Sequence, residues 1–274
     1  RVIAPGFAGL IIATIGRATG DEQAGAGASL YVTFAGFLAM ALAMYMVRMP
    51  PVQRSRGASV GHDIVDGLSF VVRNRVYIYL LGVSLIAGYF GLSYIWLMPV
   101  LAEEHFHVNA DGYGALLSAG GVGALIGVLA IASFGQYQDR PWLLIGSMVT
   151  AGGGVVALAV VSAAAPSFYA GLALMVLTGG AFASFQVATG TSVNLLVPDE
   201  YRGRVMGLRG TMFNLAPLGS LQAGLIATAM GTPFAVGLGG GVLMVAAIVV
   251  YIASPEIRGL RKLVAASTVE SRRW

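Results

Sequence analysis

Few side chains in this sequence have the type and the spacing that chemistry requires. His105 and His107 stand two residues apart beside Glu103 and Glu104, a set that could hold a metal ion at a surface, although solvated loop residues are the better explanation. The chain contains no cysteine, which excludes a disulfide framework, thiol catalysis and a Cys-ligated metal site. No nucleophile, base and orienting group share a consistent depth, and neither GxxxxGK nor a strand-borne GxGxxG pattern occurs. We therefore predict that the protein is not an enzyme and carries no metal or cofactor.

A second group of polar side chains is neutral and interrupts long apolar stretches. Tyr89 and Ser93 stand four residues apart, so they share one face of a helix. An apolar cavity with a few polar groups suits an amphiphilic ligand. A lone Ser, Thr or Tyr in such a helix, however, more often bonds a neighbouring helix. The substrate-cavity candidates are Tyr89, Ser93, Tyr94, Gln186, Thr189 and Asn214.

The elements that must position these residues are helices in lipid. Hydrophobic residues make up 57% of the 274-residue chain and charged residues only 10%, too apolar a composition for a water-soluble domain. A bilayer core of about 30 Å takes about 20 apolar residues of helix, and stretches of that length recur along the chain. Eight spans are predicted, at residues 2–15, 30–47, 76–101, 113–134, 142–164, 168–196, 205–230 and 233–253.

Some features of these spans carry further expectations. The first span is short and the chain opens on Arg1, already close to apolar sequence, so we expect a fragment whose beginning is missing. Glycine pairs at four-residue spacing put flat surfaces on one helix face, where another helix can pack. These pairs are Gly123 with Gly127 and Gly237 with Gly241.

The basic residues predict the orientation of the spans. When the connectors are assigned alternately to the two sides, fourteen cations fall on one side, and Arg17 with five acidic residues falls on the other. By the positive-inside rule the first side is cytoplasmic, and it includes the C-terminus and the group Arg202, Arg204 and Arg209. The charge of +4 therefore has a topological meaning and does not indicate a nucleic-acid partner. No ionisable residue is expected in the middle of any span.

One connector between spans is long, at residues 48–75. Its apolar and polar residues separate at helical spacing, which predicts an amphipathic helix on the inner membrane surface, with a solvated linker as the alternative. The apolar positions are Val60, Ile64, Leu68 and Val71, and the polar positions are His62, Asp63 and Asp66. The predicted organisation is two helices at residues 1–47, this cytoplasmic linker at 48–75, a six-helix unit at 76–253 and a cytoplasmic tail at 254–274.

Prolines and charged pairs form a third group of candidates. Proline in a membrane helix removes a backbone hydrogen bond, so Pro5 and Pro217 mark bends or tight crossings. A carboxylate beside an arginine at a cytoplasmic helix end can form a latch that breaks as helices move, or it can simply set topology. The candidates for such conformational roles are Pro5, Gly9, Asp139, Arg140, Arg202, Arg204 and Pro217.

Several local sequences resemble the major facilitator superfamily. Residues 4–9 resemble the GPxxGG signature on helix five of the family's exporters, with alanine replacing glycine twice. Gly135, Asp139 and Arg140 resemble a worn second copy of the family's GxLaDRxGrr loop. Residues 67–72, 197–207 and 216–220 resemble the enterobactin-exporter-like, drug-efflux branch. The resemblance covers essentially the whole chain and implies an all-α membrane protein, with helices five to twelve of a twelve-helix plan.

The function implied by this resemblance is secondary active transport by alternating access. The family's exporters suggest that small amphiphilic compounds, drug-like or siderophore-like, leave the cell across the inner membrane in exchange for protons. The implied partners are a small-molecule substrate, the lipid bilayer and protons, without nucleic acid or an obligate protein partner. The coupling carboxylate is expected in the missing helices. An importer of a polar nutrient such as a sugar and a non-transporting membrane component are the alternatives.

Overall fold

The computed structural model describes residues 22–47, 60–133 and 141–258. Within these ranges every regular element is a helix, as the sequence predicts. The chain divides into two compact units, Arg1–Ser59 and Val60–Trp274. The predictions for Pro5, Gly9, Asp139 and Arg140, and for a span at residues 2–15, concern residues outside the described ranges.

The described part of the first unit is one helix, α2 (Glu22–Met46). Its part from Leu30 to Met46 is apolar on all sides. A helix of this kind has no face that water favours, so it needs lipid or other helices around it. Its position matches the span predicted at residues 30–47.

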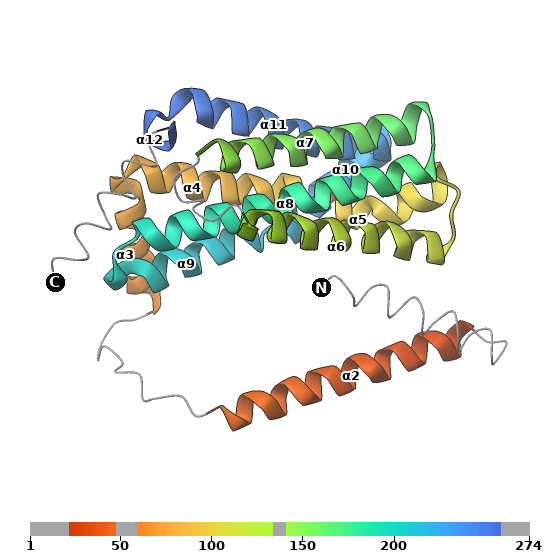
Figure 1. Ribbon diagram of the computed structural model, residues 1–274, viewed down its shortest axis with the longest axis horizontal. Coiled ribbons are helices and arrows are strands. Elements are labelled where there is room, and N and C mark those ends of the chain that lie inside the picture. The colour runs from red at the N-terminus through yellow and green to blue at the C-terminus, as the bar shows by residue number, and fades with distance from the viewer. Residues whose placement is uncertain (1–21, 48–59, 134–140, 259–274) are drawn as a thin grey trace. The chain divides into compact units, whose positions relative to one another are not determined.

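The second unit is a bundle of helices (Figure 1). Most of them run along the length of the bundle, and α3 and α12 lie at one end. In chain order the elements are α3 (Val60–Arg73), α4 (Arg75–Ile86), the π-helical turn η1 (Ala87–Gly91), α5 (Ser93–Val100), the π-helical turn η2 (Leu101–His105), α6 (Ala110–Ser133), α7 (Pro141–Ala164), α8 (Phe168–Leu196), α9 (Asp199–Phe213), α10 (Ala216–Met230), α11 (Thr232–Ala253) and α12 (Pro255–Arg258).

Five helical segments of this unit are long and apolar enough to cross a membrane. They are Arg75–His105, Ala110–Ser133, Trp142–Ala164, Phe168–Leu196 and Thr232–Ala253. Each coincides with one of the predicted spans to within a few residues. The described residues thus give five such segments and the shorter apolar helix Leu30–Met46, and the predicted total of eight spans stays a prediction.

The span predicted at residues 205–230 is not one helix. The structure has two helices there, α9 and α10, separated by a turn at Asn214 and Leu215. Pro217 lies in the first turn of α10 and has no N–H to donate to the carbonyl of Phe213, the last residue of α9. The bend expected at Pro217 is therefore a complete break in the helix.

The segment Arg75–His105 is also irregular, because it contains the π-helical turns η1 and η2. Such turns occur mostly as single bulges within α-helices, often at functional sites. η1 packs against α9, α10 and α11. At one of these contacts Gly219 of α10 lies so close to the carbonyl of Tyr89 that a Cβ on the glycine would overlap the oxygen.

α6 and α8 pack backbone to backbone through glycines. A Cβ at Gly123 would overlap the carbonyl oxygen of Val176, and one at Gly127 would overlap that of Gly180. The prediction that Gly123 and Gly127 form a packing face is confirmed. A side chain at either position would force the two helices apart.

The packing prediction for the second glycine pair is wrong for Gly241, which has nothing within 4 Å of where a Cβ would lie. The close contact between α11 and α7 falls one residue earlier, at Gly240, where a Cβ would lie 2.7 Å from the carbonyl oxygen of Gly152. Four-residue spacing identifies a possible face of a helix, but the neighbouring helix decides which glycines it touches.

Candidate functional site

The most unusual side chain in the bundle is Arg209, which the sequence analysis placed among the cytoplasmic cations. The side of the membrane stays a prediction, and the structure shows the position of Arg209 along α9. α9 begins at Asp199, so Arg209 lies ten residues into the helix, about 15 Å along its axis at the α-helical rise. The guanidinium contacts Gln186, which lies ten residues before the end of α8 and therefore at a similar depth. α9 begins several residues before the apolar sequence begins. Its third arginine, Arg209, therefore lies within the bundle and not at the start of the helix.

The Arg209 guanidinium has only neutral hydrogen-bond partners among the described residues. Its Nη2 donates to the backbone carbonyl oxygen of Gln186 and to the side-chain Oε1 of the same residue, both at 3.2 Å. Its Nε is buried and has no hydrogen-bond partner. Its Nη1 lies over Gly190, 3.6 Å from where a Cβ would be, which is an ordinary van der Waals contact. We refer to Arg209, Gln186 and Gly190 as the Arg209 site.

Aromatic side chains and a close backbone contact connect this site to η1. The ring of Phe182 on α8 lies 6.2 Å from that of Phe213 on α9. The carbonyl oxygen of Phe213 rests on Gly88 of η1, 2.6 Å from where a Cβ would lie. The next residue, Tyr89, is half-buried, with its ring edge-on to Phe90 at 4.8 Å. The predicted cavity residues Tyr89 and Gln186 thus belong to segments that are joined through α9.

The other predicted cavity residues are used within the bundle. Ser93 is buried and donates its hydroxyl to the carbonyl of Tyr89 at 2.6 Å, inside its own helix. Tyr94 is buried in a hydrophobic core cluster. Thr189 is fully buried, and its hydroxyl has no hydrogen-bond partner. Asn214 is exposed and donates to the carbonyl of Gly210 at 2.8 Å, at the end of α9.

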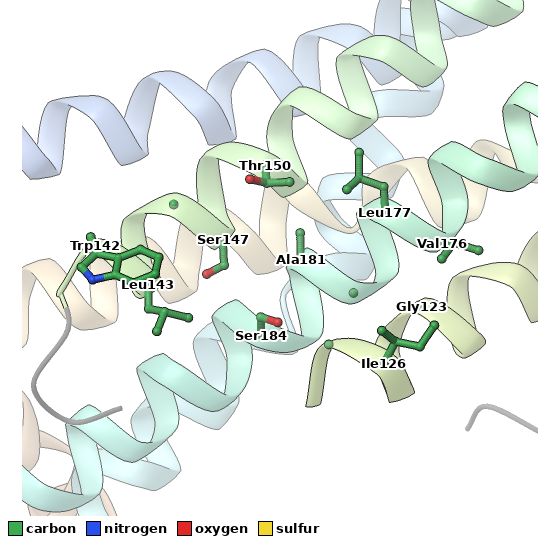
Figure 2. Close-up of a pocket in the computed structure, with 13 residues that line it drawn as sticks. Gly123, Ile126, Trp142, Leu143, Ser147, Thr150, Val176, Leu177, Ala181 and Ser184 are labelled. Atoms are coloured by element: carbon green, nitrogen blue, oxygen red, sulfur yellow. The ribbon is translucent and has the colours of Figure 1, made fainter. Parts of the chain in front are cut away.

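A separate cavity of about 490 Å³ lies between α6, α7 and α8 (Figure 2). Its walls are mostly apolar, and Ser147, Thr150 and Ser184 supply hydroxyl groups. Trp142 lies at its edge and is 60% exposed. None of the predicted cavity residues lines it. The sequence alone does not show whether an isolated Ser or Thr among glycines lines a cavity or packs against a neighbouring helix.

The end of the bundle at α3 and α9 holds the predicted conformational residues Arg202 and Arg204. Arg202 pairs with Asp199 one turn earlier at 2.6 Å, and both side chains are exposed. Arg204 reaches across to Asp66 of α3, with 3.8 Å between Nη1 and Oδ2. Gly67 meets the Cβ of Arg204, so α3 lies directly on α9. Pro217, the remaining described residue of this group, is exposed in α10.

Aromatic stacking fixes α3 in the same region. The ring of Phe70 lies 4.3 Å from that of Tyr201 and 5.0 Å from that of Tyr77. Tyr77 in turn donates its hydroxyl to the carbonyl of Leu196 at 2.7 Å. The helix predicted in the connector is present as α3, and of its expected apolar face Val71 is buried and Leu68 is 45% exposed. α3 packs on α9 through its aromatic and small residues, because the partner is another helix and not only a lipid surface.

The metal site considered for the histidines receives no support. Among the described residues no group of three or more His, Asp, Glu or Cys side chains could hold a metal ion. Glu103, Glu104 and His107 are exposed.

These features define an integral membrane protein built as a bundle of apolar helices, with Arg209 half-buried between α8 and α9. The sequence profile of the Major Facilitator Superfamily matches residues 87–269, and the chain belongs to this family of transporters. It is also similar to the protein named multidrug efflux pump Tap of Mycolicibacterium fortuitum, with 29% identity over 237 residues. This match covers 84% of the chain and 54% of the relative, so the chain spans about half the length of the curated relative it matches.

Proposed function

We propose that this protein exports small amphiphilic compounds, drug-like or siderophore-like, by alternating access. The observation that carries the proposal is the similarity to a multidrug efflux pump across most of the chain. The physical character of the bundle agrees with such substrates. The cavity between α6, α7 and α8 is mostly apolar with three hydroxyl residues, a combination that binds amphiphiles without close matching of polar groups.

In this proposal the second unit moves as one body while the contacts at its ends change. Backbone contacts through Gly123 and Gly219 hold α6, α8, η1 and α10 together. The pair Arg204 with Asp66 is part-exposed and has a long 3.8 Å separation, so it can open at little free-energy cost. We assign the latch role to this pair and to Arg202 with Asp199, and the same role to Asp139 with Arg140.

The proposed driving force is proton antiport. Among the described residues, no Asp or Glu lies in the central part of the five apolar segments. We therefore assign proton coupling to a carboxylate outside the described residues. The proposal also includes the inner membrane as the location and a cytoplasmic C-terminus, as the arginine distribution predicts.

Uptake into inside-out membrane vesicles tests the proposal. Vesicles that contain the full chain should accumulate a fluorescent amphiphile such as rhodamine 6G when a pH gradient is imposed, and a protonophore should abolish the uptake. Vesicles without the protein serve as the control. Absence of gradient-dependent uptake across a broad panel of amphiphiles, or accumulation of a sugar in vesicles of the opposite orientation, would contradict the proposed export.

A further inference from the structure

We propose that Arg209 and Gln186 form an anion-binding subsite that selects amphiphilic substrates carrying a carboxylate or another acidic group. The inference rests on the proposed transport function and adds to it the chemical class of the substrate. It starts from the charge of Arg209, which no described residue neutralises.

The first argument concerns the missing counter-charge. A cation that is removed from water is costly unless it is paired with an anion or fully hydrogen-bonded. Both acceptors on Arg209 are neutral oxygens of Gln186, and they engage only Nη2. Nε and Nη1 bond no described residue, so two of the three guanidinium nitrogens lack an acceptor. The site therefore favours the arrival of a negatively charged oxygen.

The second argument concerns the way the cation is held. Nη2 donates to α8 through one backbone and one side-chain oxygen, which orients the guanidinium toward that helix. Gly190 leaves room beside Nη1, where any side chain would lie within contact distance of the cation. The side-chain nitrogen Nε2 of Gln186 makes no hydrogen bond to a described residue, so it can donate to the same anion as Nη1. Arginine binds carboxylates through directed hydrogen bonds, which are stronger than those between neutral groups.

The third argument concerns the neighbouring surface. Phe182 and Phe213 lie one helical turn from Gln186 and Arg209 along the same two helices, with Phe182 buried and Phe213 half-buried. A ligand at this site would place its acidic group on the guanidinium and its apolar body against aromatic side chains. This combination is the recognition pattern of an acidic amphiphile, and a sugar lacks both parts.

Equilibrium binding of a matched probe pair tests the subsite. Dansylglycine is a carboxylate at neutral pH, and dansylglycinamide is its neutral counterpart. Their fluorescence is measured with the full chain in nanodiscs of zwitterionic lipid, with empty nanodiscs subtracted. We expect the acid to bind about 10-fold to 100-fold more tightly than the amide, the range typical of a hydrogen bond to a charged group.

Variants assign this preference to the site. Arg209→Gln should reduce binding of the acid to that of the amide and leave the amide within about twofold, since only the charge is lost. Arg209→Lys should keep part of the preference, because lysine retains the charge without the planar donor arrangement. If Arg209→Gln does not fold, Gln186→Leu gives the same test through the anchor. Arg73→Gln, which removes an exposed cation of α3, should change neither affinity.

Several outcomes overturn the inference. Equal binding of the acid and the amide by the wild-type protein, or no binding of the acid, would mean that a carboxylate of the protein itself neutralises Arg209. An acid preference that survives in Arg209→Gln would place the anion site elsewhere. Uptake of a panel of acidic, neutral and cationic amphiphiles in inside-out vesicles reports separately on the proposed export. Retained uptake without an acid preference would contradict the subsite alone, whereas an acid preference without uptake of any amphiphile would contradict export alone.

Discussion

The helix α8 meets its two neighbours α6 and α9 in opposite ways. Against α6 the contact at Gly123 and Gly127 is backbone on backbone, with no side chain between the helices at these two points. Against α9 the contact runs through a long charged side chain, since Arg209 reaches across to Gln186. The first contact has no rotamers to change, and the second has several in each partner. The comparison indicates that one side of α8 forms a rigid packing contact and that its other side carries the proposed binding site.

This difference has an energetic side. Close glycine contacts gain dispersion attraction at many atoms, and they leave no space for adjustment. An arginine with neutral partners adds little stability, since removing its charge from water offsets what its hydrogen bonds contribute. The α6 contact should therefore be important for folding and the α9 contact for binding. Substitutions at each contact test this division.

The largest effect is expected at the α6 contact. Gly123→Ala places a methyl group where the carbonyl oxygen of Val176 lies, so the helices must separate. We expect a loss of about 3 kcal/mol or more in unfolding free energy, at or above the usual range for overpacking, because both sides are backbone. Thermal unfolding of the purified protein in detergent measures it. Gly114→Ala in the same helix, where nothing lies within 4 Å, is the control and should leave the midpoint unchanged or slightly raised. A similar midpoint for both variants would contradict the rigid contact.

A smaller effect is expected where α10 meets η1. In Gly219→Ala the added methyl group would overlap the carbonyl of Tyr89. α10 follows a helix break and can shift more readily than α6, so we expect a loss of about 2 kcal/mol, within the range for overpacking. Gly224→Ala in the same helix has nothing within 4 Å and is the matched control. The same unfolding measurement decides the order, and a loss larger than that of Gly123→Ala would reverse the ranking.

The smallest effect on stability is expected at Arg209. Arg209→Met replaces a poorly paired cation by an apolar chain of similar length, so the unfolding free energy should change by less than about 1 kcal/mol or rise slightly. Gln186→Leu is the informative partner, since it removes a side-chain acceptor and leaves the charge. We expect that variant to lose about 1–3 kcal/mol, the usual penalty for an unsatisfied polar group. If Arg209→Met were as damaging as Gly123→Ala, the arginine would be a structural ion-pair partner and the comparison would fail.

The spans were the most predictable part of the structure. α8 has the bounds predicted for its span, residues 168–196, because a long apolar stretch between polar connectors leaves few alternatives in lipid. The contact of Gly123 and Gly127 was also predictable, since small residues on one face have few uses other than close packing. Composition and local spacing contain this information without knowledge of neighbouring helices.

The site was less predictable because it depends on how two helices align. The depth of Arg209 follows from the start of α9 at Asp199 and from the register between α8 and α9, which bring Gln186 opposite. Arg209 lies inside the predicted span 205–230, and this position is the sequence signal that indicates an arginine within the bundle. Ser93 and Tyr94 were chosen for their polarity, yet one bonds its own helix and the other is buried in the core. Polarity alone does not show whether a side chain faces a cavity.

The break between α9 and α10 changes the hydrogen bonding of the backbone close to the Arg209 site. Because Pro217 has no N–H, the carbonyl oxygen of Phe213 lacks the donor that an unbroken helix would supply, and it faces Gly88. Such an oxygen needs a donor from outside its own helix, since hydrocarbon offers none. Phe213 lies four residues after Arg209 on the same helix. The break thus places a backbone acceptor without its helical donor one turn from the Arg209 guanidinium, so unmet hydrogen-bonding capacity is concentrated where α8, α9 and η1 meet.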